Sequence, residues 1–252
     1  MDSFFQNKKY IVTGATSGIG YAIAMDLAKY GAIIGIHHHR SLKEVHSQIQ
    51  SIQELSPLSI SLQGDLRISG MADKVVQTMI EQFGEADGLV NNAGAIYQYG
   101  DFQELSMEAW DWTFAVNARA PFEMIRALWP YFLEKKGGRV VNISSATVGY
   151  SGSLRSVHYV AAKAALEAIS KTFAKDGVRD NILVNVLRLG LMNTPMHTRT
   201  PGYTPQHLES RAKLVPIGRM GEGVEAAAWV RYLLGPDAGF MTGQIIGLTG
   251  GD

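Results

Sequence analysis

The sequence predicts an α/β fold in which a doubly wound parallel sheet carries helices on both faces. Short apolar runs alternate with longer amphipathic stretches, which is the pattern of strands joined by crossover helices. A glycine-rich segment, residues 13–20, lies between the first apolar run and the first amphipathic stretch. The length of 252 residues and the hydrophobic share of 46% suit one domain with a large core. We therefore expect a single domain over residues 1–252 with about seven strands.

Each element can be placed from the spacing of the apolar residues. Strands are expected at residues 10–13, 33–37, 60–63, 88–91, 139–144, 183–187 and 244–248. Helices are expected near residues 18–30, 42–55, 70–84, 106–117, 120–135, 158–178 and 222–234. Right-handed crossovers between such strands place helices on both faces of the sheet. The exception is the irregular stretch 190–215, which carries three prolines. We expect a substrate lid there, with a short helix near 206–213; a surface excursion is the plainer alternative.

Composition excludes several classes of protein. The chain carries 23 basic and 23 acidic residues, so its net charge is zero and nothing indicates affinity for nucleic acid or an anionic membrane. The lack of cysteine excludes disulfides, thiolate metal sites and cysteine nucleophiles. The first residues show no signal-peptide core, and no stretch is long enough to cross a bilayer. A cytoplasmic location is expected.

The most informative residues are Tyr159 and Lys163, which follow the serine pair Ser144–Ser145 at the end of an apolar run. A helix brings positions i and i+4 onto one face, so the phenol and the ammonium would point the same way. A nearby positive charge lowers a tyrosine pKa and prepares the hydroxyl for proton exchange with a carbonyl or an alcohol. The same spacing occurs at Tyr131 and Lys135, but no serine-terminated strand precedes that pair.

The glycine-rich segment reads Thr13-Gly14-Ala15-Thr16-Ser17-Gly18-Ile19-Gly20. Glycines permit a tight turn and a close approach of the backbone to a diphosphate. The helix that follows presents free N–H groups and a partial positive charge. The spacing G-x-x-x-G-x-G differs from the G-x-G-x-x-G of long-chain dehydrogenases. Behind a strand, this segment predicts a phosphate-binding loop.

Further motifs follow in the order Gly64-Asp65-Leu66, Asn91-Asn92-Ala93-Gly94, Asn117, Ser145, Tyr159-x-x-x-Lys163 and Gly243-Gln244. With the glycine loop, they resemble the short-chain dehydrogenase/reductase family in its single-domain form. The general pattern is most similar to that of 3-oxoacyl-acyl-carrier-protein reductases. The resemblance covers the chain from about residue 8 to its end. It implies a Rossmann fold and an oxidoreductase that transfers a hydride between a nicotinamide cofactor and a ketone or secondary alcohol.

The resemblance also implies roles for the matching residues. Tyr159 would be the general acid in reduction and the base in oxidation. Lys163 would lower the Tyr159 pKa, and Ser145 would polarise the substrate oxygen. Asn117 would position a water that links Lys163 to a proton relay. Ser144 is the rival to Ser145, and alternation along a strand would send the two hydroxyls to opposite faces. The implied cofactor-binding residues are Gly14, Thr16, Ser17, Gly18, Ile19, Gly20, His39, Arg40, Ser41, Asp65, Leu66, Asn91, Ala93, Gly94, Tyr159, Lys163, Gly190 and Thr194.

The choice between NADP(H) and NAD(H) depends on the end of the second strand, His37-His38-His39-Arg40-Ser41. NAD-preferring relatives usually carry an acidic residue near His38, and none occurs between residues 31 and 43. Arg40 and Ser41 would instead hold the 2′-phosphate of NADP(H), which is favoured, with NAD(H) as the alternative. A plainer interpretation is that Arg40 begins a solvated helix. No metal site is expected, because successive histidines on a strand point to opposite faces.

Two segments are expected to border the substrate. Tyr150 and Arg155 lie between the serine pair and the tyrosine helix. Tyr150 would line an apolar wall, and Arg155 would make a surface or subunit contact or meet an anionic substrate group. Tyr97 and Tyr99 would form the opposite wall. The family resemblance also implies a homodimer or homotetramer, paired through the helices at 106–135 and 158–178, that acts on a small molecule.

The sequence leaves the substrate open. Asp180 stands near the place of a basic carrier-protein contact in 3-oxoacyl reductases, so sugar, polyol and secondary-metabolite ketones compete with 3-oxoacyl groups. Two other classes of protein also compete. One is a catalytically inactive dinucleotide-binding sensor or scaffold, which the intact Ser145, Tyr159 and Lys163 oppose. The other is an epimerase or dehydratase, which the glycine spacing opposes.

Overall fold

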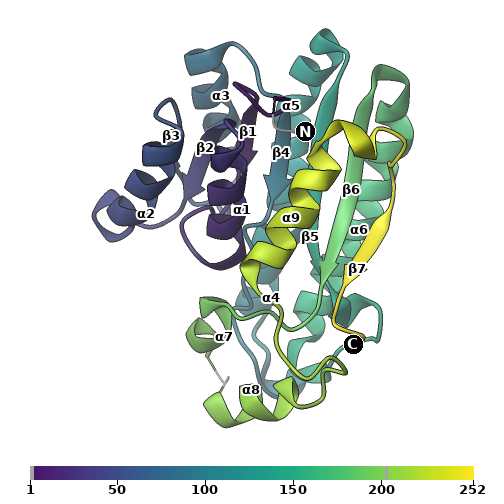
Figure 1. Cartoon of the computed structure of the whole chain (residues 1–252). Helices are drawn as coiled ribbons and strands as arrows, with labels where there is room; N and C mark the ends of the chain where they lie inside the picture. The colour runs from purple at the N-terminus through teal and green to yellow at the C-terminus, as the bar shows by residue number, and fades with distance from the viewer. Residues whose placement is uncertain (1–2, 202–203) are drawn as a thin grey trace.

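In the described part of the chain, seven strands form one parallel sheet between two layers of helices (Figure 1). This computed structural model describes residues 3–201 and 204–252. The strands are β1 (Lys9–Val12), β2 (Ile33–His38), β3 (Ile60–Gln63), β4 (Gly88–Asn91), β5 (Gly138–Ser145), β6 (Ile182–Leu189) and β7 (Ile245–Leu248). Their order across the sheet is β3-β2-β1-β4-β5-β6-β7, and all neighbours run parallel. The predicted α/β class with a doubly wound sheet is confirmed.

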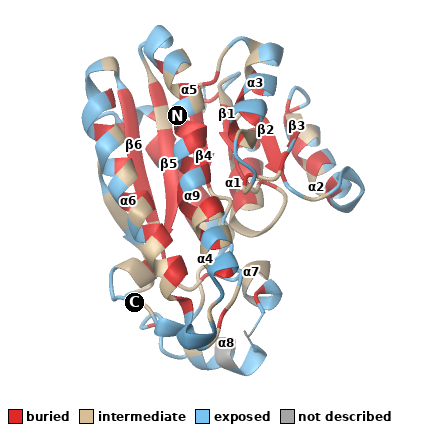
Figure 2. Cartoon of the chain, turned by 180° about the vertical axis from the view of Figure 1, so that it is seen from behind, coloured by how far each residue is buried: buried red, intermediate tan, exposed pale blue. Residues whose placement is uncertain are grey.

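The helices cover the two faces of the sheet in separate sets. On one face lie α1 (Gly18–Lys29), α2 (Leu42–Leu55) and α9 (Gly223–Leu234); on the other lie α3 (Met71–Phe83), α5 (Ala120–Lys135) and α6 (Val157–Gly177). The remaining helices are α4 (Met107–Phe114), α7 (Pro195–Arg199) and α8 (Pro205–Ala212). Figure 2 shows the buried residues concentrated in the strands and on the inward sides of the helices. Each set of helices thus closes one apolar core against the sheet.

The order of the strands predicts a cleft at the carboxyl ends of the central strands, which form one edge of the sheet. β1 pairs with β2 on one side and with β4 on the other. The crossover connections therefore leave the two sides of β1 in opposite directions, and the loops at the carboxyl ends of these strands diverge. α7 and α8 lie beyond that same edge, at the lower end of the molecule in Figure 1. Ligands of doubly wound sheets bind at such a position.

The clearest difference from the predicted elements lies between α4 and α5. The sequence predicts separate helices over 106–117 and 120–135, whereas the structure joins them through a π-helical turn, Ala115–Arg119. α5 itself has the predicted bounds. A π turn widens the helix locally and redirects the side chains inside it, among them Asn117. Apolar spacing does not signal such a turn, because buried Ala115 and Ala118 also suit an ordinary helix.

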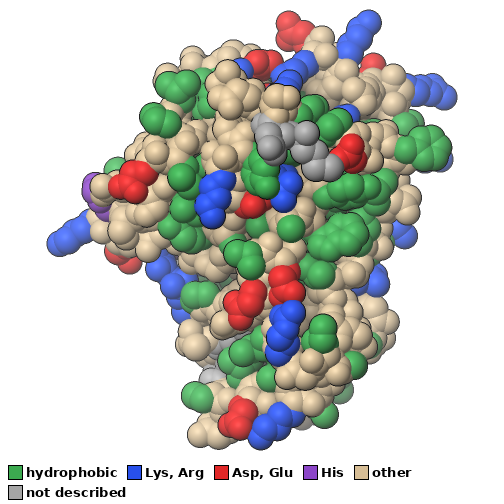
Figure 3. All heavy atoms as spheres, viewed as in Figure 1, with side chains coloured by type: hydrophobic (Ala, Val, Ile, Leu, Met, Phe, Trp, Pro, Cys, Tyr) green, Lys and Arg blue, Asp and Glu red, His purple; other side chains and the backbone are tan. Residues whose placement is uncertain are grey.

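The stretch 190–215 contains two short helices, α7 and α8, of which the second matches the helix predicted near 206–213. Residues 202–203 within it lie outside the described residues. Within the described ranges, no helix combines the length and the apolar character needed to span a bilayer. Acidic and basic side chains are interspersed on the face shown in Figure 3, as suits a net charge of zero.

Candidate active site

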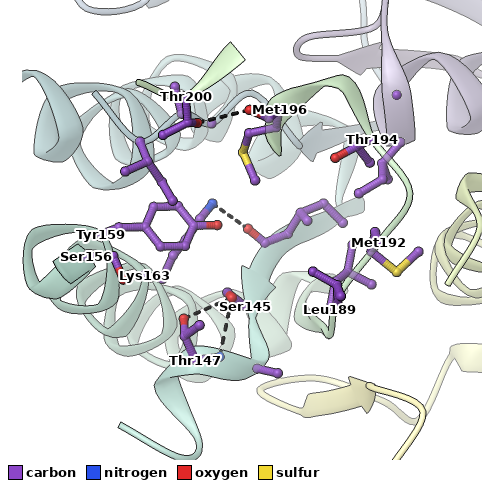
Figure 4. A pocket seen from close by; sticks show the side chains of 18 of the residues that line it. Ser145, Thr147, Ser156, Tyr159, Lys163, Leu189, Met192, Thr194, Met196 and Thr200 are labelled. Carbon is purple, nitrogen blue, oxygen red and sulfur yellow. Dashed lines mark hydrogen bonds between the residues drawn. The ribbon is translucent and has the colours of Figure 1, made fainter. Parts of the chain in front are cut away.

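A cavity of about 630 Å³ opens at the carboxyl ends of the strands. Its walls come from the β1–α1 loop, the ends of β4, β5 and β6, the start of α6 and the α7–α8 segment. Figure 4 shows Tyr159 and Lys163 pointing into it from α6, with Ser145 at the end of β5 and Thr194 and Met196 across the cavity. A concave site with a few convergent polar groups has the form of a small-molecule site.

The glycine loop is held against the end of β4. Gly14 has a φ of 65°, in the left-handed region that favours glycine. A Cβ on Gly20 would lie 2.3 Å from the Gly14 carbonyl oxygen, so a larger residue would separate the loop from the helix. The Thr13 hydroxyl accepts hydrogen bonds at 2.9 Å from the backbone N–H groups of both Asn92 and Ala93. These contacts fix the loop at the rim of the cavity.

The N-terminus of α1 meets the cavity and suits a diphosphate. α1 begins at Gly18, and within the described residues the N-cap Ser17 makes no side-chain hydrogen bond to it. The first N–H groups are therefore open to an anion, and the helix dipole adds a partial positive charge. Ser17, Gly18 and Ile19 all line the cavity. The residues present thus fit the phosphates of a dinucleotide.

His37 supports the glycine loop, a role that the sequence did not reveal. Its Nδ1 accepts a hydrogen bond from the Gly14 N–H at 3.1 Å, so Nε2 donates to the Gly64 carbonyl at 3.0 Å. Burial lowers the His37 pKa to about 4, and the ring is neutral at pH 7. The available signal was a polar ring on a strand buried on both faces, where each ring nitrogen needs a partner.

A second hollow adjoins the glycine loop between α1, α2 and α7. Thr16, Arg40 and Arg199 line it. Burial lowers the Arg199 pKa, and repulsion from Arg40 lowers it further, so two cations lie close to one space. Ser41 instead donates its hydroxyl to Glu44 at 2.7 Å, at the start of α2. Arg40 lines the hollow, where its charge suits a phosphate. The Ser41 hydroxyl instead stabilises the start of α2.

Asp65 and Asn91 make contacts within the protein. The Arg67 guanidinium donates to the Asp65 carboxylate, with a shortest distance of 2.6 Å, and holds the Asp65 pKa below its usual range. Asn91 is buried and donates to Asn142 Oδ1 at 2.8 Å. Neither side chain lines the cavity among the described residues. Within the described residues, both side chains are therefore bound to other protein groups and not directed into the cavity.

The structure brings part of the predicted cofactor set together. The members that line the main cavity are Gly14, Ser17, Gly18, Ile19, Ala93, Gly94, Tyr159, Lys163, Gly190 and Thr194. Those that line the second hollow and not the first are Thr16 and Arg40. Among the described residues, the members that line neither are Gly20, His39, Ser41, Asp65, Leu66 and Asn91. The residues expected at the diphosphate and nicotinamide end thus converge, whereas those expected at the adenosine end are spread over several segments.

Lys163 is buried beside Tyr159 on α6. Its Nζ donates to the Ile143 carbonyl at 2.8 Å and lies 5.7 Å from the centre of the Tyr159 ring. Only 3% of Lys163 is exposed. This burial lowers its pKa from 10.5 to about 8, against the attraction of Glu167, which raises it. At pH 7 the ammonium is still mostly protonated and places a positive charge beside the phenol.

The two adjacent serines have different surroundings. Both serines contribute to the cavity wall, and there the Ser145 oxygen accepts a hydrogen bond from the Thr147 hydroxyl at 2.9 Å (Figure 4). The buried Ser144 donates to Glu167 at 2.7 Å. The same carboxylate binds the Arg188 guanidinium at 2.7 and 2.9 Å. Alternation along β5 accounts for the difference, and it leaves the Ser145 hydroxyl accessible to a ligand.

Asn117 lies in the π turn near Lys163. Its Nδ2 donates to the carbonyls of Ala95 and Thr113, at 2.7 and 2.9 Å. Its buried Oδ1 has no hydrogen-bond partner among the residues described. A Cβ on Gly94 would lie 2.8 Å from this Oδ1 and 3.4 Å from Lys163 Nζ. The lack of a side chain at Gly94 therefore lets the two polar groups approach the same space.

The second Tyr-x-x-x-Lys match has a structural role. Lys135 pairs with Glu85 at 2.6 Å and also with Asp87. Tyr131 packs at the edge of the apolar core that α3, α5 and α6 share. Within the described part of the chain, neither residue lines the cavity.

Some of the residues expected to border the substrate line the cavity. Tyr99, Tyr150 and Arg155 line the cavity. Tyr97 does not belong to the described lining; its ring packs on Trp112, with ring centres 4.5 Å apart. Tyr97 thus packs against an aromatic partner on α4, and its place in a substrate wall stays a prediction.

Comparisons with known proteins agree with this geometry. The chain matches the family model "short chain dehydrogenase" over residues 8–202. It is 32% identical over 249 residues to a 3-oxoacyl-[acyl-carrier-protein] reductase of Thermotoga maritima, with 98% of each chain covered. It is 34% identical over 246 residues to nodulation protein G of a Rhizobium species, covering 97% of this chain and 96% of the relative.

Solved structures give the same result. A blue fluorescent protein from a metagenomic library, in complex with NADPH, is 30% identical with a TM-score of 0.90 and covers 98% of both chains. An NADP-bound 3-oxoacyl (acyl-carrier-protein) reductase from Agrobacterium tumefaciens is 28% identical with a TM-score of 0.90, over 100% of this chain and 97% of that one. The chain belongs to the short-chain dehydrogenase/reductase family. It is an NAD(P)-dependent oxidoreductase that acts on CH–OH or C=O groups.

Proposed function

We propose that the protein interconverts a ketone and a secondary alcohol with NADP(H), and that Tyr159 is its general acid and base. The observation that carries this proposal is the convergence of Tyr159, Lys163 and Ser145 on a cavity that also contains the open N-terminus of α1. A buried lysine ammonium costs free energy, since burial lowers its pKa. A protein that only binds a dinucleotide would gain nothing from burying an ammonium beside Tyr159. The burial of Lys163 therefore favours an enzyme over a sensor.

The mechanism uses few groups. When bound, NADPH supplies the hydride for the carbonyl carbon. The Ser145 hydroxyl donates a hydrogen bond to the carbonyl oxygen, and the Tyr159 hydroxyl gives its proton to that oxygen as negative charge develops. Lys163 stabilises the resulting phenolate with its ammonium and, in the family pattern, orients the nicotinamide ribose. We assign the Oδ1 of Asn117, which has no partner among the described residues, to binding the water that returns the proton through Lys163. In oxidation the same groups act in reverse.

Replacing Tyr159 tests the proposal. We expect Tyr159→Phe to lower kcat by roughly a thousandfold or more, since general acid–base catalysis contributes about 10²–10⁴. The dissociation constant for NADPH, measured by fluorescence titration, should stay within about twofold, because the glycine loop and the α1 N-terminus are untouched. Tyr131→Phe is the matched control and should retain turnover. Retained turnover in Tyr159→Phe would contradict the acid and base role.

The preference for NADP(H) is supported by the second hollow. Arg40 and Arg199 place two cations there, and the second strand ends without an acidic residue. NADPH and NADP in the similar solved structures point the same way. We expect kcat/KM for NADPH to exceed that for NADH, and Arg40→Gln to reduce this ratio by about tenfold. The adjacent exposed Lys43 supplies the control, and Lys43→Gln should leave the ratio unchanged. A preference for NADH in the unaltered protein would contradict the assignment.

Among substrates, we favour 3-oxoacyl compounds. The support is the similarity to a 3-oxoacyl reductase over nearly the whole chain, together with the apolar side chains of Ile96, Met192 and Met196 in the cavity wall. A panel of 3-oxoacyl thioesters, cyclic ketones and keto sugars, followed by NADPH absorbance, ranks the classes by kcat/KM. Faster reduction of a cyclic ketone or sugar would replace this assignment.

We further infer that the whole chain works as one domain and that residues 190–215 form the lid, since Met196 and Arg211 complete the cavity wall. The family resemblance favours a homodimer or homotetramer, and the exposed apolar ring of Phe122 on α5 supports pairing through the helices at 106–135 and 158–178. Light scattering measures the assembly directly, and a persistent monomer would contradict it.

A further inference from the structure

The cavity has an uneven distribution of charge. Lys163, Arg155, Arg199 and Arg211 line it, whereas no aspartate or glutamate occurs among its described lining residues. The chain as a whole carries equal numbers of acidic and basic residues. The cationic character therefore belongs to this site and not to the protein in general, and it favours ligands with negative charge.

Three of the four cations already have a task. Lys163 is buried beside Tyr159 and hydrogen-bonds the Ile143 carbonyl. The Arg211 guanidinium is paired with the Asp252 carboxylate. Arg199 also lines the second hollow, where the charge of Arg40 is close enough to lower its pKa. The phosphates of the cofactor would engage that end of the cavity, which leaves the charge of Arg155 to be explained.

Arg155 is held in the cavity wall by packing on Tyr99. Its guanidinium carbon lies 4.9 Å from the centre of the Tyr99 ring, and the ring is only 8% exposed. Stacking on an aromatic face orients the planar guanidinium and leaves its N–H donors at the edge. In the part of the chain that the structure describes, no carboxylate forms an ion pair with Arg155. This cation is oriented and accessible.

The backbone of Arg155 is fixed independently of its side chain. The Arg155 N–H donates to the Ser153 hydroxyl at 3.2 Å, and its carbonyl accepts from the Gly100 N–H at 3.2 Å. Neither contact uses the guanidinium. Replacing the side chain should therefore leave the loop before α6 in place, and Tyr159, four residues further on, with it.

We propose that the substrate carries an anionic group that Arg155 binds while the carbonyl lies at Ser145 and Tyr159. The inference rests on the proposed function and names the chemistry of its substrate: a ketone joined to an apolar body and a carboxylate or phosphate. A planar guanidinium binds either group through paired hydrogen bonds, so both a free oxo acid and a phosphate-bearing thioester satisfy the site. Tyr99 and Met196 supply apolar wall in the same cavity.

Two matched pairs of substrates test this proposal. The first pair is 3-oxohexanoate and its neutral methyl ester; the second is 3-oxohexanoyl-CoA and the neutral N-acetylcysteamine thioester of the same acid. NADPH absorbance gives kcat/KM for each, and the readout is the ratio of the charged to the neutral member. We expect this ratio to exceed one in the unaltered protein and to fall about tenfold in Arg155→Gln, for the pair whose anion Arg155 binds. A fall in the first pair identifies a carboxylate, and a fall in the second identifies a phosphate.

Two variants separate recognition from folding. Arg155→Lys keeps the charge and should retain an intermediate ratio, since an ammonium cannot stack and bind in the same paired geometry. Arg179→Gln removes an exposed arginine outside the cavity lining and should leave both ratios at the value of the unaltered protein. Equal losses for charged and neutral members in Arg155→Gln, or unchanged ratios in both pairs, would overturn the inference. Tyr159-dependent turnover of the neutral members would leave the proposed function standing in that case. A failure to reduce any of the four compounds would reject the proposed substrate class and this inference together.

Discussion

Tyr159–Lys163 and Tyr131–Lys135 share one spacing on two neighbouring helices, α6 and α5, and differ in what surrounds them. Lys163 has a backbone carbonyl as its hydrogen-bond partner and lies in the cavity wall. Lys135 has two carboxylates as partners at the end of its helix. The spacing brings a phenol and an ammonium onto one side of a helix. The surrounding residues then decide whether the ammonium forms ion pairs with carboxylates, as in Lys135, or stays beside the phenol, as in Lys163.

Removing each ammonium should give the largest contrast. We expect Lys163→Met to lower kcat by about a thousandfold, because the phenolate of Tyr159 would lose the charge that stabilises it. Lys135→Met should leave kcat within about twofold, since Glu85 and Asp87 lie outside the described cavity lining. Steady-state kinetics on the two variants measures both. Equal losses would mean that the helices act as one unit and that the spacing alone carries no assignment.

The neighbouring serines provide a second contrast, between two identical side chains on one strand. Ser145→Ala should lower kcat by about 10²–10³, the usual effect of removing one donor to a developing oxyanion. Ser144→Ala should act on stability instead. It leaves the buried Glu167 with one hydrogen bond fewer, at a cost of about 1–3 kcal/mol in unfolding free energy. Kinetics and urea unfolding on both variants separate the two effects, and a large kcat loss in Ser144→Ala would reverse the assignment.

The unfolding free energies of Lys163→Met and Lys135→Met should change in opposite directions. Burial lowers the Lys163 pKa from 10.5 to about 8, so between these values the unfolded chain binds more protons and stability rises with pH. Lys163→Met should therefore stabilise the protein at pH 7, by up to about 3 kcal/mol, and the gain should shrink towards pH 10.

Lys135 has the opposite sign. Burial alone would lower its pKa, but hydrogen bonds to Asp87 and Glu85 raise it above the ordinary value. Its contribution to stability is present below the ordinary lysine pKa and is lost as the pH rises through the raised value. Lys135→Met should therefore destabilise the protein at pH 7, by about 1 kcal/mol. Thermal unfolding at pH 7 and pH 10 measures both lysines, and a destabilised Lys163→Met would show that its hydrogen bond outweighs the cost of burial.

The convergence of the glycine loop, Ser145 and the Tyr159–Lys163 pair on one cavity could be predicted from the sequence. The glycine spacing, the serine-terminated strand and the i,i+4 pair are local patterns, and local patterns fix local geometry. The π turn around Asn117 was not predictable in this way, because the residues of that turn suit an ordinary helix too. Nor was the pairing of Glu167 with Arg188 or the support of Gly14 by His37, since each joins residues far apart in the chain. Much of the cavity wall comes from loops, where apolar periodicity carries no information, so the packing of Tyr97 on Trp112 could not be predicted either.

Hydrogen bonds from the inner side of α6 fix the position of this helix along β5. Lys163, Glu167 and Ser170 occur at intervals of four and three residues, and each is hydrogen-bonded to a group of β5. A shift of α6 by one residue would break all three hydrogen bonds at once. We therefore expect the distance from Tyr159 to Ser145 to stay constant. We expect backbone amides along this ladder to exchange with deuterium more slowly than those of the α7–α8 segment. The place of Tyr159 would then be constrained by α6 and β5, whereas the α7–α8 part of the cavity wall could accept substitutions without moving Tyr159.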